Sequence, residues 1–148
     1  MDAEVTLPWI PGAIRALLLA DPVFVEACPG GVTPRAPSDV TRPYATVQAA
    51  GNYQMDQSST VFRPLIQIDG WCGGTSASPQ PLAWRVAAEA ARVLSTARNA
   101  AWGDLHFTAR ITDGPMELSP DVSRGPSLPV YRAVIRAELT VHVRISPV

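Results

Sequence analysis

The chain has 148 residues, a formal net charge of −1 and a hydrophobic content of 47%. This length suits one domain with a buried core, and a near-neutral charge does not favour a non-specific nucleic-acid binder, which would be strongly basic. No apolar run reaches the roughly 18 residues of a membrane-spanning helix, and the start of the chain does not resemble a signal peptide. We therefore expect one globular domain, residues 1–148, without a membrane partner and without export.

The first predicted elements are helices. Pro11 suits the first turn of a helix, and Asp21-Pro22 has the character of a break followed by a new N-cap. We expect a helix of about ten residues and then a shorter one, ended by Gly30-Gly31. A proline-rich connector then runs extended into a short strand at residues 44–50.

The middle of the chain predicts a loop, a strand and the clearest helix. The polar stretch 51–60 is long for a hairpin loop and leads into a strand at residues 61–73. Pro64 cannot donate a hydrogen bond within a sheet, which indicates an edge strand or a bulge. An apolar stripe then predicts a helix over residues 79–98.

Two strands close the chain, at residues 105–114 and 131–145, with 116–129 expected as the loop between them. The last strand alternates apolar and polar residues, and at about 3.3 Å per residue it would be roughly 50 Å long. The order α-β-β-α-β-β predicts an α+β fold: a four-stranded, mostly antiparallel sheet with two main helices on one face and a long C-terminal strand.

The residues that could carry chemistry are few. His106 and His142 lie on the polar faces of strands expected to pair, and with Asp69 they could in principle bind a metal or relay protons. Their spacing matches no known ligand pattern, so surface histidines are the favoured interpretation. Cys28 and Cys72 lack the close spacing of a metal or redox motif, which favours two buried or half-buried thiols. We expect no enzyme activity, catalytic residue, cofactor or metal.

The solvent face of the last strand is rich in arginine, and every basic residue of the chain is arginine. A long strand edge beside such a face needs a covering partner, and head-to-tail pairing of identical chains closes a ring when the rotation permits. Arginine makes bidentate contacts with carboxylates across interfaces. The candidates for a subunit interface or a ring lumen are Arg132, Arg136, Glu138, Arg144 and Arg110.

The order of these features resembles the tail terminator (tail completion) proteins of long-tailed bacteriophages and gene transfer agents. The resemblance runs from about Pro8 to Val143 and lies in the sequence of elements rather than in one motif. It is carried by "IRALLLADPVFVEAC", "RPYATV", "FRPLIQIDGWCGG" leading into "PLAWRVAAEAARVL", and "SPDVSRGPSLPVYRAVIRAELTVHV".

The resemblance implies a structural virion protein, made in the host cytoplasm and placed at the neck of the tail. Such proteins form a hexameric ring that caps the tail tube, ends its polymerisation and joins it to the head-tail connector or stopper. Genomic DNA passes through the lumen as non-specific cargo. Loop residues would contact the neighbouring tube or connector, and the candidates are Asn52, Tyr53, Met55, Asp56, Asp121 and Arg124.

Three other interpretations stay open from the sequence. A head-side adaptor or stopper of the neck would also form a ring, although many adaptors are largely helical. A small enzyme or ligand-binding domain would use His106, His142 and Asp69 around a pocket. A host-encoded dimeric module of another role is the third.

Overall fold

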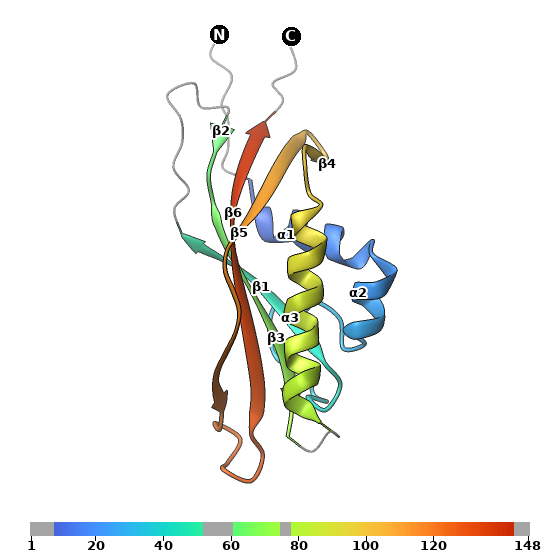
Figure 1. The fold of residues 1–148 in the computed structure, drawn as a ribbon, viewed down its shortest axis with the longest axis vertical. Helices are drawn as coiled ribbons and strands as arrows, with labels where there is room; N and C mark the ends of the chain where they lie inside the picture. Colours follow the sequence, from blue (N-terminus) through green and yellow to red (C-terminus); the bar gives the residue numbers. More distant parts are fainter. Residues whose placement is uncertain (1–7, 52–60, 75–77, 144–148) are drawn as a thin grey trace.

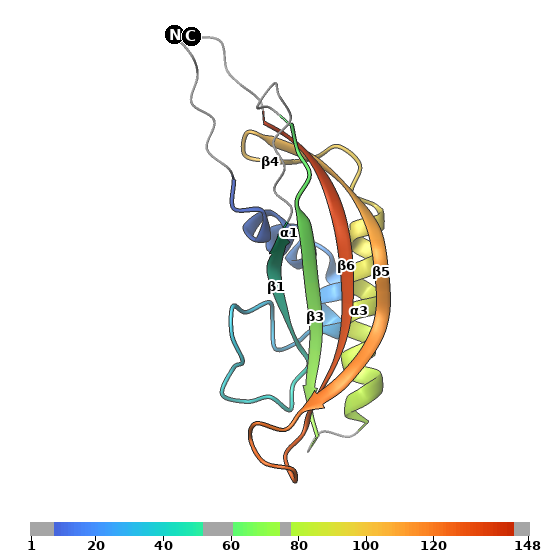
Figure 2. The ribbon, with the colours of Figure 1, turned by 90° about the vertical axis from the view of Figure 1, so that its left-hand side faces the viewer.

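The structure is a computed structural model that describes residues 8–51, 61–74 and 78–143. In this part of the chain three helices pack against one face of an antiparallel sheet (Figures 1 and 2). The helices are α1 (Ile10–Leu19), α2 (Pro22–Ala27) and α3 (Pro79–Ser95). The strands are β1 (Tyr44–Gly51), β2 (Val61–Phe62), β3 (Leu65–Gly73), β4 (Ala100–Trp102), β5 (Leu105–Asp121) and β6 (Val130–Val143).

The strands lie in the order β1-β3-β6-β5-β4, and β2 also pairs with β6. The expected α+β fold, the antiparallel sheet and the long C-terminal strand are confirmed. The expected number of strands was wrong, because the sheet has six strands instead of four, whereas the two main helices and the shorter one are all present. The additional strands are β4, which pairs with the start of β5, and β2, which is separated from β3 by a break.

Pro64 is the cause of that break. Phe62 pairs with Val141, and the pairing with β6 resumes only at Leu65, opposite Glu138. Between them the Leu139 N–H donates to the Pro64 carbonyl at 3.0 Å. The register is the same on both sides of Pro64, so the ladder is interrupted there without the bulge that the sequence offered as one possibility. β3 is nevertheless an internal strand, since it lies between β1 and β6.

β5 extends seven residues beyond its expected end at 114 and finishes at Asp121. Met116, Glu117 and Leu118 pair with β6, although prolines at 115 and 120 and the polar residues around them favour a loop. The expected loop at 116–129 was therefore wrong in its first half. Pairing with a long neighbouring strand outweighs local turn propensity here, and register shifts accommodate the prolines.

The core lies between the sheet and α3. β6 contributes a buried row on this side, made of Ala133, Ile135, Ala137, Leu139 and Val141. Gly70 of β3 allows α3 to come close, because a Cβ there would lie 2.5 Å from the Ala83 carbonyl oxygen and 2.8 Å from the Val86 Cβ. Cys28 and Cys72 are both buried free thiols, and burial raises the pKa of Cys28 to about 12.

Candidate interface on the helix-free face of the sheet

The sheet has a second face that none of the three helices covers, and we call it the helix-free face (Figure 2). It is formed by the even-numbered residues of β6 and by the residues paired with them on β3 and β5. Arg132, Arg136 and Glu138 of the predicted set lie here, because side chains alternate between the two faces of a strand. The sequence pattern assigned these side chains to the correct face.

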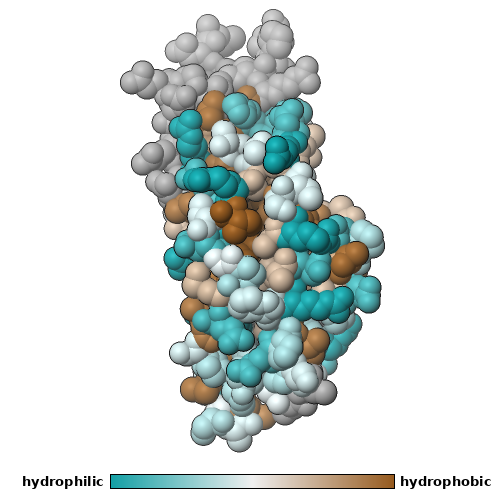
Figure 3. All heavy atoms as spheres, in the orientation of Figure 1, coloured by the Kyte–Doolittle hydropathy of each residue, from teal (hydrophilic) through white to brown (hydrophobic). Residues whose placement is uncertain are grey.

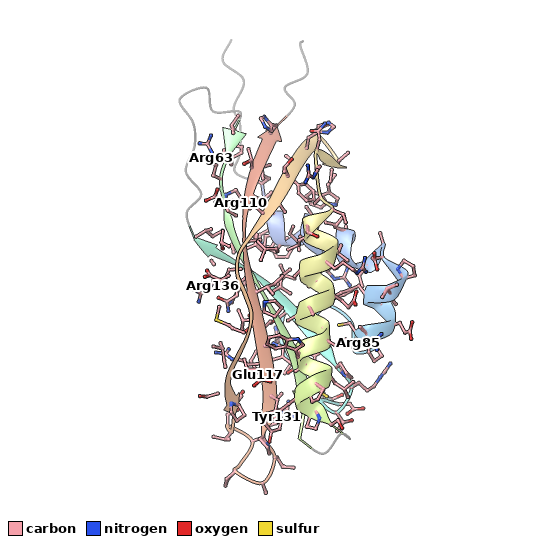
Figure 4. The ribbon with its side chains drawn as sticks, in the orientation of Figure 1. Arg63, Arg85, Arg110, Glu117, Tyr131 and Arg136 are labelled. Atoms are coloured by element: carbon pink, nitrogen blue, oxygen red, sulfur yellow. The ribbon has the colours of Figure 1, made fainter. Side chains whose placement is uncertain are left out.

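Arginines from three segments align along this face. Figure 4 shows Arg63, Arg110 and Arg136 one below another on one side of the molecule, while Arg85 of α3 points away on the other side. Arg110 lies opposite Glu138 in the β5–β6 ladder, and its Nη2 is 3.5 Å from the Glu138 Oε1. Both side chains are substantially exposed, so this ion pair contributes little to stability.

A buried carboxylate anchors the middle of the face. Asp69 is 3% exposed, accepts a hydrogen bond from the Gln67 Nε2 at 2.8 Å and lies 3.3 Å from the Arg132 Nη1. Arg136 in turn donates from Nε to the Gln67 Oε1 at 3.2 Å. The two arginines of β6 are thus held by two polar side chains of β3, and all four groups form one continuous network.

Aromatic side chains extend this network toward β1. The Arg132 guanidinium lies 5.2 Å from the ring centroid of Trp71, and Trp71 stacks on Tyr44 with a centroid separation of 6.1 Å. The Trp71 Nε1–H donates to the Thr46 hydroxyl at 3.0 Å. An arginine held over an aromatic ring loses much of its conformational freedom, so its position is fixed before any partner arrives.

The electrostatics of the network are set by burial. Loss of hydration raises the pKa of the Asp69 carboxyl, against the opposing effects of the Gln67 hydrogen bond and the Arg132 and Arg136 charges. Arg136 itself has no carboxylate within ion-pair distance in the described part of the chain. Its exposed guanidinium is therefore available to an acidic group outside the domain.

The remaining candidates are more scattered. Asp121 ends β5 and accepts a hydrogen bond from the Ser123 N–H at 2.9 Å, which lowers the pKa of its carboxyl. Arg124 follows in the loop between β5 and β6, fourteen residues after Arg110. The candidates outside the described residues are Asn52, Tyr53, Met55, Asp56 and Arg144.

The two histidines are brought together, but Asp69 is not near them. His106 and His142 are direct partners in the β5–β6 ladder, whereas Asp69 pairs with Val134, eight residues from His142 on the same strand. Eight residues of strand span about 26 Å, so a three-residue site is excluded. Within the three described ranges, no group of three or more His, Cys, Asp or Glu side chains is placed to hold a metal.

Sequence reasoning missed the supporting residues of the interface. Trp71 and Tyr44 were not singled out, and Asp69 was considered only as a ligand for the histidines. The available signal was the alternation of Gln67, Asp69 and Trp71 along β3, which places all three on one face. The contacts of Asp69 and Trp71 with Arg132, and of Gln67 with Arg136, depend on the strand order, which the pattern does not provide.

No known protein-family model matches the chain, and no curated protein matches it in sequence. A membrane-crossing helix is absent from the described part of the structure.

Proposed function

We propose that this chain is a ring-forming structural protein that caps a phage-type tail tube, ends its polymerisation and joins it to the head connector. The observation that carries the proposal is the helix-free face, where long strands present pre-positioned arginines from β5 and β6. Rigid, exposed guanidinium groups next to unpaired strand edges suit repeated contact between identical subunits. The resemblance of the element order to tail terminator proteins supports the same role.

The charges of the helix-free face suit a subunit contact, or the wall of a channel through which DNA passes, better than a surface that binds DNA tightly. Arg63, Arg110, Arg132 and Arg136 are accompanied on this face by the carboxylates of Asp69, Asp113 and Glu138. A face with nearly balanced charges does not release many counterions from DNA, so passing DNA would be held weakly. Figure 3 shows the molecule in the orientation of Figure 1, with the helix-free face turned to the left, and the side that faces the viewer is a mixture of polar and apolar residues.

The direct test is the mass and shape of the assembly. Native mass spectrometry and negative-stain imaging are applied to the purified chain, alone and with tail tubes of the virus or transfer agent that encodes it. We expect rings of about six copies or six-fold density on tube ends. Monomers that leave tube ends bare at high protein concentration would refute the proposal, and rings that bind the head connector but never tubes would favour a neck adaptor or stopper.

Charge reversal tests the arginine face within this assembly. Arg136→Glu removes the guanidinium that has no carboxylate partner in the described part of the subunit, so we expect ring formation to weaken by about tenfold or more. Arg85→Glu is the matched control, because it makes the same charge change on the opposite side of the molecule (Figure 4). Equal assembly of the two variants would argue against a role for this face.

A further inference from the structure

The two outer edges of the sheet are both free of strand partners over part of their length. The parallel bridge between Val32 and Ala45 covers the start of β1, and no strand in the described part of the chain pairs with the outer side of the rest of β1. β4 covers only the start of β5, up to Phe107, and just beyond it the Ala109 N–H donates to the Ala97 carbonyl at 3.0 Å, so the free part of β5 begins after Ala109. Unpaired backbone groups at a sheet edge are available to another strand.

The two free stretches lie at the same height in the sheet. Across the ladders, Gln48 aligns with Asp113 through Gln67 and Arg136, and Gly51 aligns with Arg110 through Leu65 and Glu138. The free part of β1 therefore spans the same rows as the free part of β5. Rotation about a ring axis does not shift a subunit along that axis. If the strands run nearly parallel to the axis, the β1 and β5 stretches that lie in the same rows can therefore meet between neighbouring subunits.

The directions of the two edges also match. Each of the three ladders from β1 through β3 and β6 to β5 is antiparallel, so β1 and β5 run in opposite directions. A second copy in the same orientation would therefore place its β5 antiparallel to β1. This is the arrangement that a head-to-tail ring requires, because no subunit has to be inverted.

The charges on the two edges are complementary. Along β5, the exposed carboxylates Asp113, Glu117 and Asp121 have no ion-pair partner within the described residues. The β1 side carries three exposed arginines on α1 and on the connector before β1, at positions 15, 35 and 42, against one exposed carboxylate, Asp39. Acidic and basic edges of this kind attract each other and disfavour pairing of two like edges.

The aligned pairing positions across the sheet specify one side-chain contact, between Glu117 and Arg15. Glu117 aligns with Ala45 through Ala133 and Gly70, and Ala45 is the bridge partner of Val32. The Val32 carbonyl accepts a hydrogen bond from the Arg15 Nε at 3.1 Å, which holds the exposed Arg15 guanidinium beside this row.

A groove of about 420 Å³ opens at the same place. Its lining consists of Trp9, Pro11, Arg15, Val32, Thr33, Pro34 and Val47. Trp9, 72% exposed, forms part of its wall. A strand added at this edge would place alternate side chains into such a groove.

We propose that the outer edge of β1 and this groove receive the β5 edge of a second copy, antiparallel and in matching rows, with Glu117 of one copy beside Arg15 of the next. This inference rests on the proposed ring, and it adds a contact between two sheet edges to the contact proposed for the helix-free face. Pro115 has no N–H and interrupts the β5 edge, so backbone pairing is confined to Arg110–Asp113, opposite the free part of β1. At the Glu117 row the backbone of Ala45 is already bonded to Gly31 and Thr33, so Glu117 makes only its side-chain contact with Arg15.

Disulfide trapping tests the rows directly. The variant Gln48→Cys with Asp113→Cys is oxidised with glutathione disulfide, and covalent multimers are measured on denaturing gels and by mass spectrometry. Within one subunit the two positions are separated by β3 and β6, about 14 Å, so a bond between them has to join two copies. The unmodified chain controls for the native thiols, which are both buried.

The matched control combines Gln48→Cys with Asp121→Cys. The β6 partner of Asp113 is Arg136 and that of Asp121 is Val130, so the two positions lie six rows apart. Six rows along a strand correspond to about 20 Å. We expect at least about tenfold more multimers from the first variant, because a disulfide requires Cα atoms within about 7 Å. Equal or absent multimers in both would overturn the edge pairing.

Imaging of the unmodified chain with tail tubes, compared with the crosslinking result, distinguishes the proposed function from the proposed edge pairing. Six-fold rings on tube ends together with a failed 48–113 crosslink would overturn the edge pairing and leave the proposed function intact. Absence of rings and of crosslinks would overturn both. Efficient 48–113 crosslinking without tube capping would support the pairing of the two edges and refute the role in the tail.

Discussion

Asp69 is the only buried polar or charged residue in the described ranges, and it lies on the face that the helices leave open. Its charge is tolerated because Gln67 and Arg132 compensate for lost hydration. The arrangement also fixes the sheet register, since a slip of one residue would turn the Asp69 side chain toward α3 and the apolar core. Alternation along β3 places Asp69 on the face opposite the apolar core. It did not predict the burial, which results from side chains on other strands.

Removing the arginine of the Arg132–Asp69 ion pair should destabilise the fold. We expect Arg132→Met to lower the free energy of unfolding by about 2 kcal/mol near pH 7, less than for a fully buried pair because the Arg132 side chain is 33% exposed. The pKa of Asp69 is raised in the folded state. The Asp69 carboxyl therefore takes up its proton at a higher pH in the folded protein than in the unfolded protein. Once Asp69 is neutral, it no longer needs the Arg132 charge, so the loss of stability caused by Arg132→Met should shrink as the pH falls toward 4. Urea unfolding at several pH values measures it.

The control for this prediction is Arg136→Met. Arg136 contacts Gln67 and has no carboxylate partner in the described part of the chain, so its loss should cost less than about 1 kcal/mol with little pH dependence. Equal costs for the two substitutions, or a deficit of Arg132→Met that grows on acidification, would contradict the account of Asp69.

At the scale of elements, the β5–β6 hairpin and α3 determine the shape of the domain. The periodicity of β6 and α3 was strong enough to locate both within a few residues, because each buries a continuous apolar face. The second half of β5 was missed. Its residues from Pro115 to Asp121 have the composition of a loop, and only pairing with β6 makes them a strand. A disturbance at Pro64 was expected because its cause, the missing N–H, is local, but the strand is interrupted there and the bulge offered for it is absent.

Gly70 sets the distance between α3 and the sheet. Gly70→Ala would place a Cβ within 2.5 Å of the Ala83 carbonyl oxygen, so helix or sheet has to shift. We expect a loss of about 1–3 kcal/mol in the free energy of unfolding, measured by thermal and urea denaturation. Gly12→Ala in α1 is the control, because its closest contacts are 3.3 Å and alanine favours the helix. It should change stability by less than about 1 kcal/mol, and an equal loss would contradict the close-approach argument.

At the scale of the whole molecule, the sheet has different edges on its two sides, one acidic and one basic. Sequence reasoning placed the arginine-rich face correctly, and its expectation of a self-associating edge stays a prediction. It could not identify which edges remain free, because that depends on the strand order β1-β3-β6-β5-β4 and on how far β4 covers β5. The aligned heights of the two free stretches likewise follow only from three ladders taken together.

Exchanging the charges of Arg15 and Glu117 tests this complementarity in solution. Arg15→Glu and Glu117→Arg each place like charges together at every interface of a head-to-tail ring, so each alone should weaken association by about tenfold. The double variant restores an opposite pair at every interface and should recover most of the loss. Sedimentation velocity over a range of concentrations measures association, and circular dichroism checks that each variant is folded. A folded double variant that associates no better than the single variants would mean that these two side chains do not meet.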